Sequence, residues 1–427
     1  MDMLENDRQH FDDILEDVKS YCSEFLSGAD IKNLWGSLPE SRIDHLPENG
    51  IGAREAFKLF LKTYEPIFTG RCGPRFLGYV NGGVTPAALA GDWLTTTFDF
   101  CPQMGIADRG DLTPWIELET LNLIKELLSI PQTFCGGFVS GATMSNFTGL
   151  AVARQWAGKQ LGKDFAEDGI DASVWSVLSA TAHSSSIKAL SMLGMGRRAH
   201  IKIHSIEDRE CIDVGDLEIY LNKLGSRPAI IIANAGTVNT GDFDEIEAIV
   251  NLKKKYNIWI HVDGAFGGLV ACSPKHAHLV KGWDQVDSIT VDTHKWMNLP
   301  YDSGLTFIHP SHKEHQYDVF KLVNAQYLGS DENFRFNNNT PETSRRMRSL
   351  PAWISLIAYG RHGFRQIVEN CVEHAQTLGK LIGASEDYEL LAPVRLNVVC
   401  FTVRQSTLKN LNTDVPKIME KINARGI

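Results

Sequence analysis

The sequence is poor in cysteine, in basic charge and in long apolar stretches. Its eight cysteines are scattered over 427 residues without a CxxC pair, which argues against a disulfide framework or a zinc ribbon and is typical of reduced thiols in the cytoplasm. The formal net charge of -10 argues against a nucleic-acid partner. No apolar run approaches the length of a membrane span, and the polar, acidic start resembles neither a signal peptide nor a transit peptide. We therefore expect a cytoplasmic protein with no membrane or nucleic-acid partner.

Hydrophobic residues make up 43% of the chain, which is enough for a large core and more than one domain. Helical spacing predicts a helix over about residues 7–26, stopped at Gly28, and a second helix from Thr113 to Leu128. From about residue 135, short apolar strands alternate with helices, which indicates a mostly parallel sheet covered on both faces. The expected strands are 136–140, 174–178, 200–203, 229–233, 258–263 and 287–292, and the helices between them are 143–156, 185–193, 216–224 and 244–256.

The pattern changes after Arg346, where a helical stretch is followed by an extended segment over 397–403 and one more helix. This predicts a second, smaller α+β domain. The predicted fold is therefore α/β, with a mostly parallel central sheet and flanking helices. We expect three parts: an N-terminal helical segment (1–75), a large α/β domain (76–345) and a small C-terminal domain (346–427).

An acid and a lysine end two neighbouring strands of this expected sheet. Asp263 closes strand 258–263, and Lys295 follows strand 287–292, so adjacent parallel strands would bring both to one edge. Pyridoxal phosphate (PLP) uses such a pair: the lysine forms a Schiff base, and the carboxylate lies against the pyridine nitrogen, where it keeps the ring an electron sink. A solvated lysine and a turn-capping aspartate are the simpler interpretations of each residue alone. The combination favours a PLP site.

Three further loops would reach the same edge. The small, hydroxyl-rich segment Ser140–Asn146 begins a helix, which suits the cofactor phosphate, although an ordinary helix cap would look the same. His183 would stack on the ring face opposite Ala265, with a capping role as the alternative. Thr237 would hydrogen-bond the ring hydroxyl or the substrate carboxylate, or would be a plain turn residue.

These motifs resemble the group II PLP-dependent amino-acid decarboxylases, a family that includes aromatic-amino-acid, histidine, glutamate and cysteine-sulfinate decarboxylases. The resemblance covers the chain from about Pro74 onward. Four motifs carry it in chain order: Ala142–Asn146, Thr181–Ser185, His261–Ala265 and Asp292–Trp296. By contrast, His309, His312 and His315 are regularly spaced but lie in a charged, surface-like stretch, so we predict no metal site.

The resemblance implies a PLP-dependent transferase of fold type I, usually an obligate homodimer with its active sites at the subunit interface. It implies decarboxylation of an L-amino acid to an amine and carbon dioxide. By motif position, Lys295 would hold PLP, Asp263 would pair with its nitrogen, and His183 would stack on the ring and share in catalysis. The residues that would bind the phosphate are His294, Thr143, Met144 and Ser145.

The substrate stays open in this resemblance. Asn81 would lie in a substrate-pocket loop, but Leu89–Thr96 resembles the glutamate branch of the family and Arg345–Leu350 the aromatic branch. Phe336 takes the place of a loop tyrosine that many relatives use to protonate the substrate carbanion, which suggests aldehyde-forming oxidative decarboxylation–deamination or transamination as alternatives. Relatives continue beyond the equivalent of Ile427, so we expect an incomplete small domain, and a PLP-binding protein without turnover is a third possibility.

Overall fold

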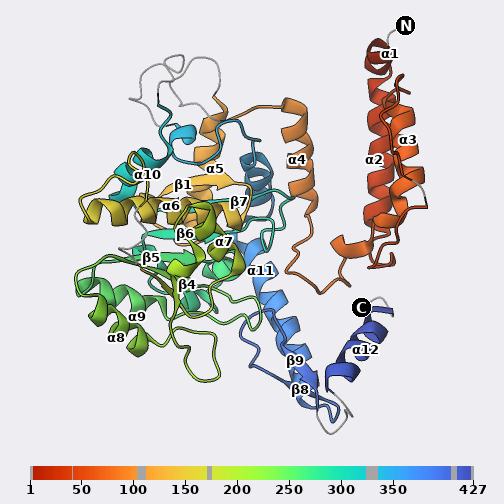
Figure 1. Cartoon of the computed structure of the whole chain (residues 1–427). Coiled ribbons are helices and arrows are strands. Elements are labelled where there is room, and N and C mark those ends of the chain that lie inside the picture. The colour runs from red at the N-terminus through yellow and green to blue at the C-terminus, as the bar shows by residue number, and fades with distance from the viewer. Residues whose placement is uncertain are drawn as a thin grey trace. The chain divides into compact units, whose positions relative to one another are not determined.

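The computed structural model describes residues 3–40, 42–102, 112–170, 176–323, 335–404 and 411–424 (Figure 1). Contacts divide the chain into two compact units: Met1–Gly83 with Leu408–Ile427, and Val84–Thr407. We had expected boundaries after residues 75 and 345, and the structure places the first near residue 83. The separate folding of 346–427 as a small domain stays a prediction. None of the described helices is long and apolar enough to cross a membrane.

The first unit consists of helices joined by irregular segments. The helix expected over 7–26 is present as two helices, interrupted at His10, and Gly28 caps its end as predicted. Arg54 and Asp17 link the second and third helices through an ion pair. The helices are α1 (Met3–Gln9), α2 (Phe11–Ser27), α3 (Ala53–Tyr64), which we did not predict, and α12 (Leu411–Ala424).

The second unit is built on a seven-stranded sheet with the order β1-β7-β6-β5-β4-β2-β3. Strand β7 runs antiparallel to β1 and β6, and the remaining pairs are parallel, so the mostly parallel sheet is confirmed. The strands are β1 (Cys135–Val139), β2 (Ser176–Ser179), β3 (His200–Lys202), β4 (Ala229–Asn234), β5 (Ile258–Asp263), β6 (Ser288–Val291) and β7 (Gly304–Ile308).

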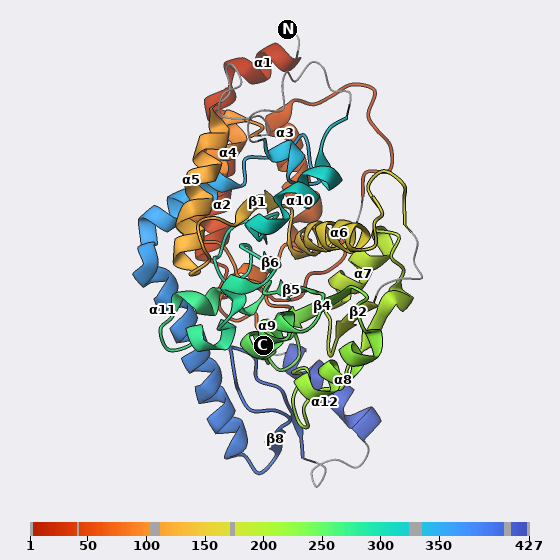
Figure 2. The ribbon, with the colours of Figure 1, turned by 90° about the vertical axis from the view of Figure 1, so that its left-hand side faces the viewer.

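Helices cover both faces of this sheet, as parallel strands buried on both sides require. Helix α6 packs on β1, β5, β6 and β7, and α7 packs on α6 (Figure 2). Leu150, Trp156, Ile230 and Trp259 are central to the core between them. The helices are α4 (Pro86–Phe98), α5 (Thr113–Leu127), α6 (Ala142–Gln160), α7 (Ser184–Met192), α8 (Val214–Leu224), α9 (Ile246–Asn251) and α10 (Lys313–Phe320).

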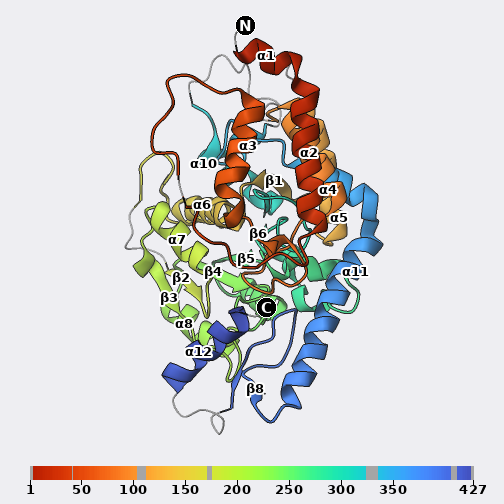
Figure 3. The same cartoon turned by 90° about the vertical axis from the view of Figure 1, so that its right-hand side faces the viewer.

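The segment after Arg346 is mainly one long helix, α11 (Ser349–Gly383), which changes direction at Gly360. It contacts α4, α5 and the short strand β8 (Tyr388–Leu390) (Figure 3). The extended stretch that we expected over 397–403 forms a strand only as β9 (Phe401–Val403), which pairs with β8. The first half of α11 therefore belongs to the packing of the large unit.

Candidate active site

The strands end so that the predicted residues meet at one sheet edge. The register pairs Asn234 with Asp263 and Asp263 with Thr290, which places Asp263 between the ends of β4 and β6. Lys295 lies in the turn that follows β6, and His183 lies in the turn that follows β2. The edge also carries the turn from β1 into α6, because β1 runs in the same direction as these strands.

These turns enclose a cavity of about 350 Å³. Its lining brings together groups from three separate parts of the sequence. They are Ser140, Gly141, Ala142, Thr143, Met144, His183, Ser185, Asp292, His294 and Lys295. The structure thus joins the predicted phosphate loop, the predicted stacking histidine and the predicted Schiff-base lysine around one space.

The start of α6 forms the anion-binding end of this cavity. The amides of Met144 and Ser145 bond to the Gly141 carbonyl, whereas those of Ala142 and Thr143 find no acceptor in the described part of the chain. Free amides at a helix N-terminus, with the helix dipole behind them, attract anions. An added side chain at Gly141 would place its Cβ 3.3 Å from the His294 ring, so glycine keeps the turn close to that histidine.

Lys295 lies beside a buried acid. Its Nζ is 3.2 Å from Asp292 Oδ2, and the two side chains are 20% and 3% exposed. Burial raises the pKa of Asp292, and the positive charge of Lys295 opposes that rise. The neighbouring His294 donates from Nδ1 to the Ser303 carbonyl at 2.7 Å, and its ring packs on Tyr301. This hydrogen bond directs the other ring nitrogen of His294 toward the Asp292 side of the cavity, 3.5 Å from Oδ2.

Asp263 is held as a hydrogen-bond acceptor by neutral donors. Its Oδ2 accepts from the Asn146 amide at 2.9 Å and from the Ser186 hydroxyl at 3.2 Å. Its Oδ1 accepts from the backbone N–H of Ala265 at 3.2 Å and keeps capacity for one more donor. The carboxylate is only 6% exposed, so it is oriented rather than solvated.

His183 both caps α7 and lines the cavity. Its Nδ1 accepts from the Ser185 backbone N–H at 3.2 Å and lies 2.7 Å from the Ser185 hydroxyl. The capping role and the cofactor role, which the sequence presented as alternatives, are therefore compatible, because capping uses Nδ1 and leaves the rest of the ring exposed.

Three predicted residues make other contacts in the structure, and their roles at the cofactor or substrate stay predictions. The Ser145 hydroxyl is fully buried and donates to the Leu305 carbonyl. The Thr237 hydroxyl donates to Glu210 at 2.5 Å. Phe336 is fully buried, with the Arg345 guanidinium 4.8 Å above its ring. Asn81 belongs to the other unit, and its role stays a prediction.

Sequence reasoning missed the groups that orient the predicted residues. They are Asn146, Ser185, Ser186 and Asp292. Three of them lie inside motifs that we had recognised and Ser186 directly follows one, but their side chains were left without a role. The alternation of side chains along β5 could have indicated these partners, because it places every second residue of Ile258–Asp263 on the face that α6 covers.

The pyridoxal-dependent decarboxylase conserved domain matches residues 61–404. The chain belongs to this family. The decarboxylase is 30% identical over 393 residues to the aromatic-L-amino-acid decarboxylase of Bacillus atrophaeus, covering 90% of this chain and 79% of the relative. It is 26% identical over 400 residues to an L-2,4-diaminobutyrate decarboxylase of Rhizobium meliloti, covering 91% and 76%. A solved structure, Oryza sativa TDC with PLP and tryptamine, shares the fold with a TM-score of 0.86 at 19% identity, covering 98% of this chain and 89% of that chain.

The residues of the decarboxylase fit PLP. The free amides of Ala142 and Thr143 suit a phosphate, the exposed ring of His183 suits stacking, and the remaining acceptor capacity of Asp263 suits a protonated pyridine nitrogen. The enzyme is thus a PLP-dependent carboxy-lyase that acts on an L-amino acid. When bound, PLP supplies an electron sink for the charge left on the substrate as carbon dioxide departs.

Proposed function

We propose that Lys295 is the residue that binds PLP covalently during decarboxylation of an L-amino acid to an amine and carbon dioxide. Its position in a cavity that also contains a helix N-terminus and an exposed histidine ring carries the proposal. Phe266 and Trp296 pack together next to the lysine turn, with ring centroids 5.6 Å apart.

The other cavity residues have separate tasks in this proposal. Ala142, Thr143 and His294 bind the phosphate, and His183 covers one face of the ring while Ala265 lies against the other. Asp263 accepts from the pyridine nitrogen, which favours the positively charged ring. Binding at the phosphate end fixes the orientation of the substrate and therefore of the bond that breaks. This favours the transition state over the ground state, as catalysis by differential binding requires.

The named relatives favour decarboxylation over the alternative reactions. Aldehyde formation rests on Phe336 replacing a loop tyrosine, and that replacement stays a prediction. The named relatives are decarboxylases of aromatic amino acids, 2,4-diaminobutyrate and aspartate. We propose an aromatic L-amino acid as the first substrate to test, because the aromatic relative matches 90% of the chain at 30% identity.

The test is a panel of aromatic, basic and acidic L-amino acids on purified, PLP-loaded protein, scored for carbon dioxide and amine. Lys295→Ala should abolish the long-wavelength absorbance of covalently bound cofactor and reduce turnover to background. Lys281→Ala is the matched control, because Lys281 is 68% exposed and only pairs with Glu247. Survival of the absorbance band in Lys295→Ala would refute the assignment, and aldehyde with peroxide as products would refute the reaction.

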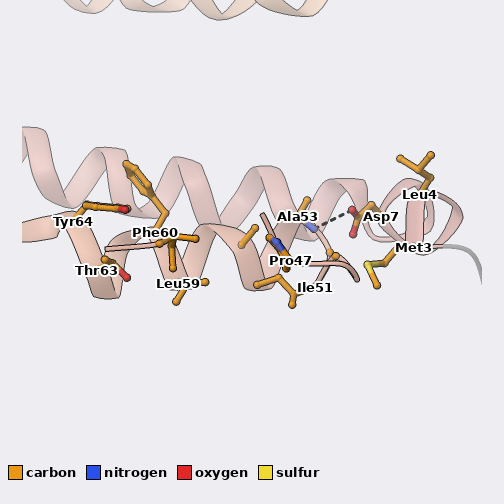
Figure 4. A pocket seen from close by; sticks show the side chains of 14 residues that line it. Met3, Leu4, Asp7, Pro47, Ile51, Ala53, Leu59, Phe60, Thr63 and Tyr64 are labelled. Atoms are coloured by element: carbon orange, nitrogen blue, oxygen red, sulfur yellow. Dashed lines mark hydrogen bonds between the residues drawn. The ribbon is translucent and has the colours of Figure 1, made fainter. Parts of the chain in front are cut away.

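We further propose that the enzyme is a homodimer whose second copy covers the apolar face of α1–α3. This face carries a groove of about 510 Å³ between α1 and α3, lined by Met3, Ile51, Leu59 and Phe60 (Figure 4). Phe11 and Leu15 on α2 are also about half exposed. Apolar patches of this kind are uncommon on monomers and common at obligate interfaces.

Light scattering at several concentrations tests the dimer. Leu59→Asp should shift the protein toward monomer, whereas Ile219→Asp, at an exposed apolar position on α8, should not. A monomeric wild-type protein would refute the proposal. We also propose a cytoplasmic location, supported by eight cysteines that are all free in the structure.

A further inference from the structure

A chain of hydrogen bonds runs from the core of the sheet to the active site. Trp259, His261 and Asp263 alternate along β5, and all face α6. The Trp259 indole N–H donates to Ser288 Oγ at 3.0 Å, and Ser288 Oγ lies 2.7 Å from His261 Nδ1. His261 Nε2 lies 2.9 Å from Asn146 Oδ1, and the Asn146 amide donates to Asp263 at 2.9 Å.

The two ends of this chain determine the direction of every hydrogen in it. The indole of Trp259 can only donate, so the Ser288 hydroxyl accepts from it and donates its own proton to His261 Nδ1. The carboxylate of Asp263 can only accept, so the Asn146 NH₂ group must face it and the Asn146 carbonyl must face His261. His261 is therefore the Nε2–H tautomer, with both nitrogens used.

Burial is consistent with this neutral imidazole. His261 is 1% exposed, and burial lowers its pKa to about 4, while the negative charge of Asp263 opposes the shift. The space around the ring is also filled. A Cβ on Gly149 of α6 would lie 2.7 Å from His261 Nδ1 and 3.1 Å from Ser288 Oγ, so the helix approaches this part of the chain closely.

The chain branches at Asn146 toward the second cofactor-facing residue. The Asn146 amide also donates to Ser185 Oγ at 3.1 Å. Ser185 then donates its hydroxyl proton to His183 Nδ1 at 2.7 Å, and its backbone N–H donates to the same nitrogen at 3.2 Å. With two donors on Nδ1, the proton of a neutral His183 ring must be on Nε2.

We propose that His261 is a positioning residue that acts through Asn146: it orients Asp263 and holds His183 as the Nε2–H tautomer, so that one buried chain aligns both groups. This inference rests on the proposed roles of Asp263 and His183. Without a donor at His261, nothing holds the Asn146 carbonyl, so the carboxamide can turn and weaken its hydrogen bonds to both Asp263 and Ser185. The Ser185 hydroxyl, no longer fixed by Asn146, can then turn away from His183, which would lose one of its two Nδ1 partners.

The variants His261→Gln and His261→Leu separate this role from simple core filling. A glutamine can accept from Ser288 and donate to Asn146 in the same directions, whereas a leucine can do neither. The matched control is His200→Gln, since His200 also has a serine partner, Ser179 Oγ at 2.7 Å, but is only partly buried and lies on the edge strand β3.

Nitrogen-15 spectra of ring-labelled histidine in the PLP-free enzyme give the first measurement. Wild-type protein, His200→Gln and His261→Gln should show His183 as the Nε2–H tautomer, and His261→Leu should show a mixture. In the loaded enzyme, His261→Leu should reduce kcat by about 100-fold, the effect of misplacing a catalytic group by about 1 Å, with KM changed less than about threefold. His261→Gln should restore kcat to within about threefold of wild type.

The proposal is wrong if wild-type His183 carries its proton on Nδ1, or if His261→Leu leaves the tautomer and kcat unchanged. Should His261→Leu fail to fold, Ser288→Ala provides the second variant, because it removes the partner of His261 Nδ1, and the same shift of His183 toward mixed tautomers is expected. The predicted spectra together with no decarboxylation of any amino acid would support the chain and refute the proposed function instead.

Discussion

A buried ion pair under the cofactor loop provides a sharp test of the packing. Glu117 on α5 and Arg345 are both 0% exposed, and Arg345 Nη2 lies 2.9 Å from Glu117 Oε1. Arg345 also donates to the carbonyl of Phe138 at 3.3 Å, and Glu117 accepts from the Phe138 N–H at 3.3 Å. Because β1 ends at Val139, this pair holds the strand that leads directly into the cavity loop.

The substitution Glu117→Gln keeps the shape and removes the charge. Two unit charges 2.9 Å apart attract by roughly 6 kcal/mol at an effective dielectric constant near 20, and the remaining amide returns part of this as a hydrogen bond. Burial raises the pKa of Glu117, and Arg345 opposes that rise. Because burying the charge is itself unfavourable, the loss of stability in Glu117→Gln should be smaller than the bare attraction between the two charges. We expect a loss of about 3–5 kcal/mol, because an unpaired guanidinium is left buried.

Urea unfolding followed by tryptophan fluorescence measures this loss. With an m value of about 3 kcal/mol/M, the midpoint should fall by roughly 1–1.7 M. Glu218→Gln is the control, since its partner Lys255 is 67% exposed and solvent screens the pair, so this midpoint should stay near that of wild type. If the free energies of unfolding of Glu117→Gln and Glu218→Gln both lie within about 1 kcal/mol of wild type, the charge-pair reasoning is refuted.

Three further predictions concern pH, the cofactor loop and the thiols. Burial lowers the pKa of His261 from 6.5 to about 4, so as the pH falls the unfolded chain binds a proton at His261 before the folded chain does. The contribution of His261 to the free energy of unfolding is therefore complete above pH 6.5 and falls by about 3 kcal/mol toward pH 4. The free energies of unfolding of wild type and His261→Gln, measured across this range, should converge at low pH. Gly304→Ala would place a Cβ 2.6 Å from Gly141 Cα, and we expect PLP affinity, measured by absorbance titration, to fall more than about tenfold as the loop shifts. Burial raises the pKa of Cys211 to about 12 whereas Cys72 is exposed, so a thiol reagent at pH 8 should modify Cys72 rapidly and Cys72→Ser should remove that fast phase; a fast reaction at Cys211 would contradict the burial.

The regular spacing of large apolar residues allowed most of the sheet to be predicted, whereas α4 has no such spacing and could not be predicted. The runs 229–233 and 258–263 contain mainly β-branched and apolar residues, and both form central strands. Helix α4 instead buries small residues, Ala88, Gly91 and Thr95, because it approaches α11 closely: a Cβ on Gly91 would lie 2.7 Å from the backbone of Pro351. Such a contact leaves no stripe of large apolar residues for a pattern search to detect.

The meeting of Asp263 with Lys295 followed from strand direction alone, whereas the partners of each residue did not. Ser145 and Asn146 are adjacent and equally polar, yet the rotation of α6 on the sheet turns Ser145 toward Leu305 and Asn146 toward Asp263. That rotation depends on side chains from several strands, so the sequence of the loop does not determine it. Motif matching therefore located the segment, but the direction of each side chain in it came only from the structure.

The distribution of charge in the site explains why its orienting groups are neutral. In its proposed role, Asp263 must stay available to a positively charged ring nitrogen, and a lysine or arginine beside it would compete for the same carboxylate. Asn146, Ser186 and the Ala265 amide orient Asp263 without a formal charge, and the buried His261 that supports Asn146 is neutral as well. Lys295, which lines the cavity, is paired instead with Asp292. Two buried acids at the ends of neighbouring strands thus differ in their partners. Neutral donors hold Asp263 and leave it available to the cofactor, whereas Asp292 pairs with Lys295.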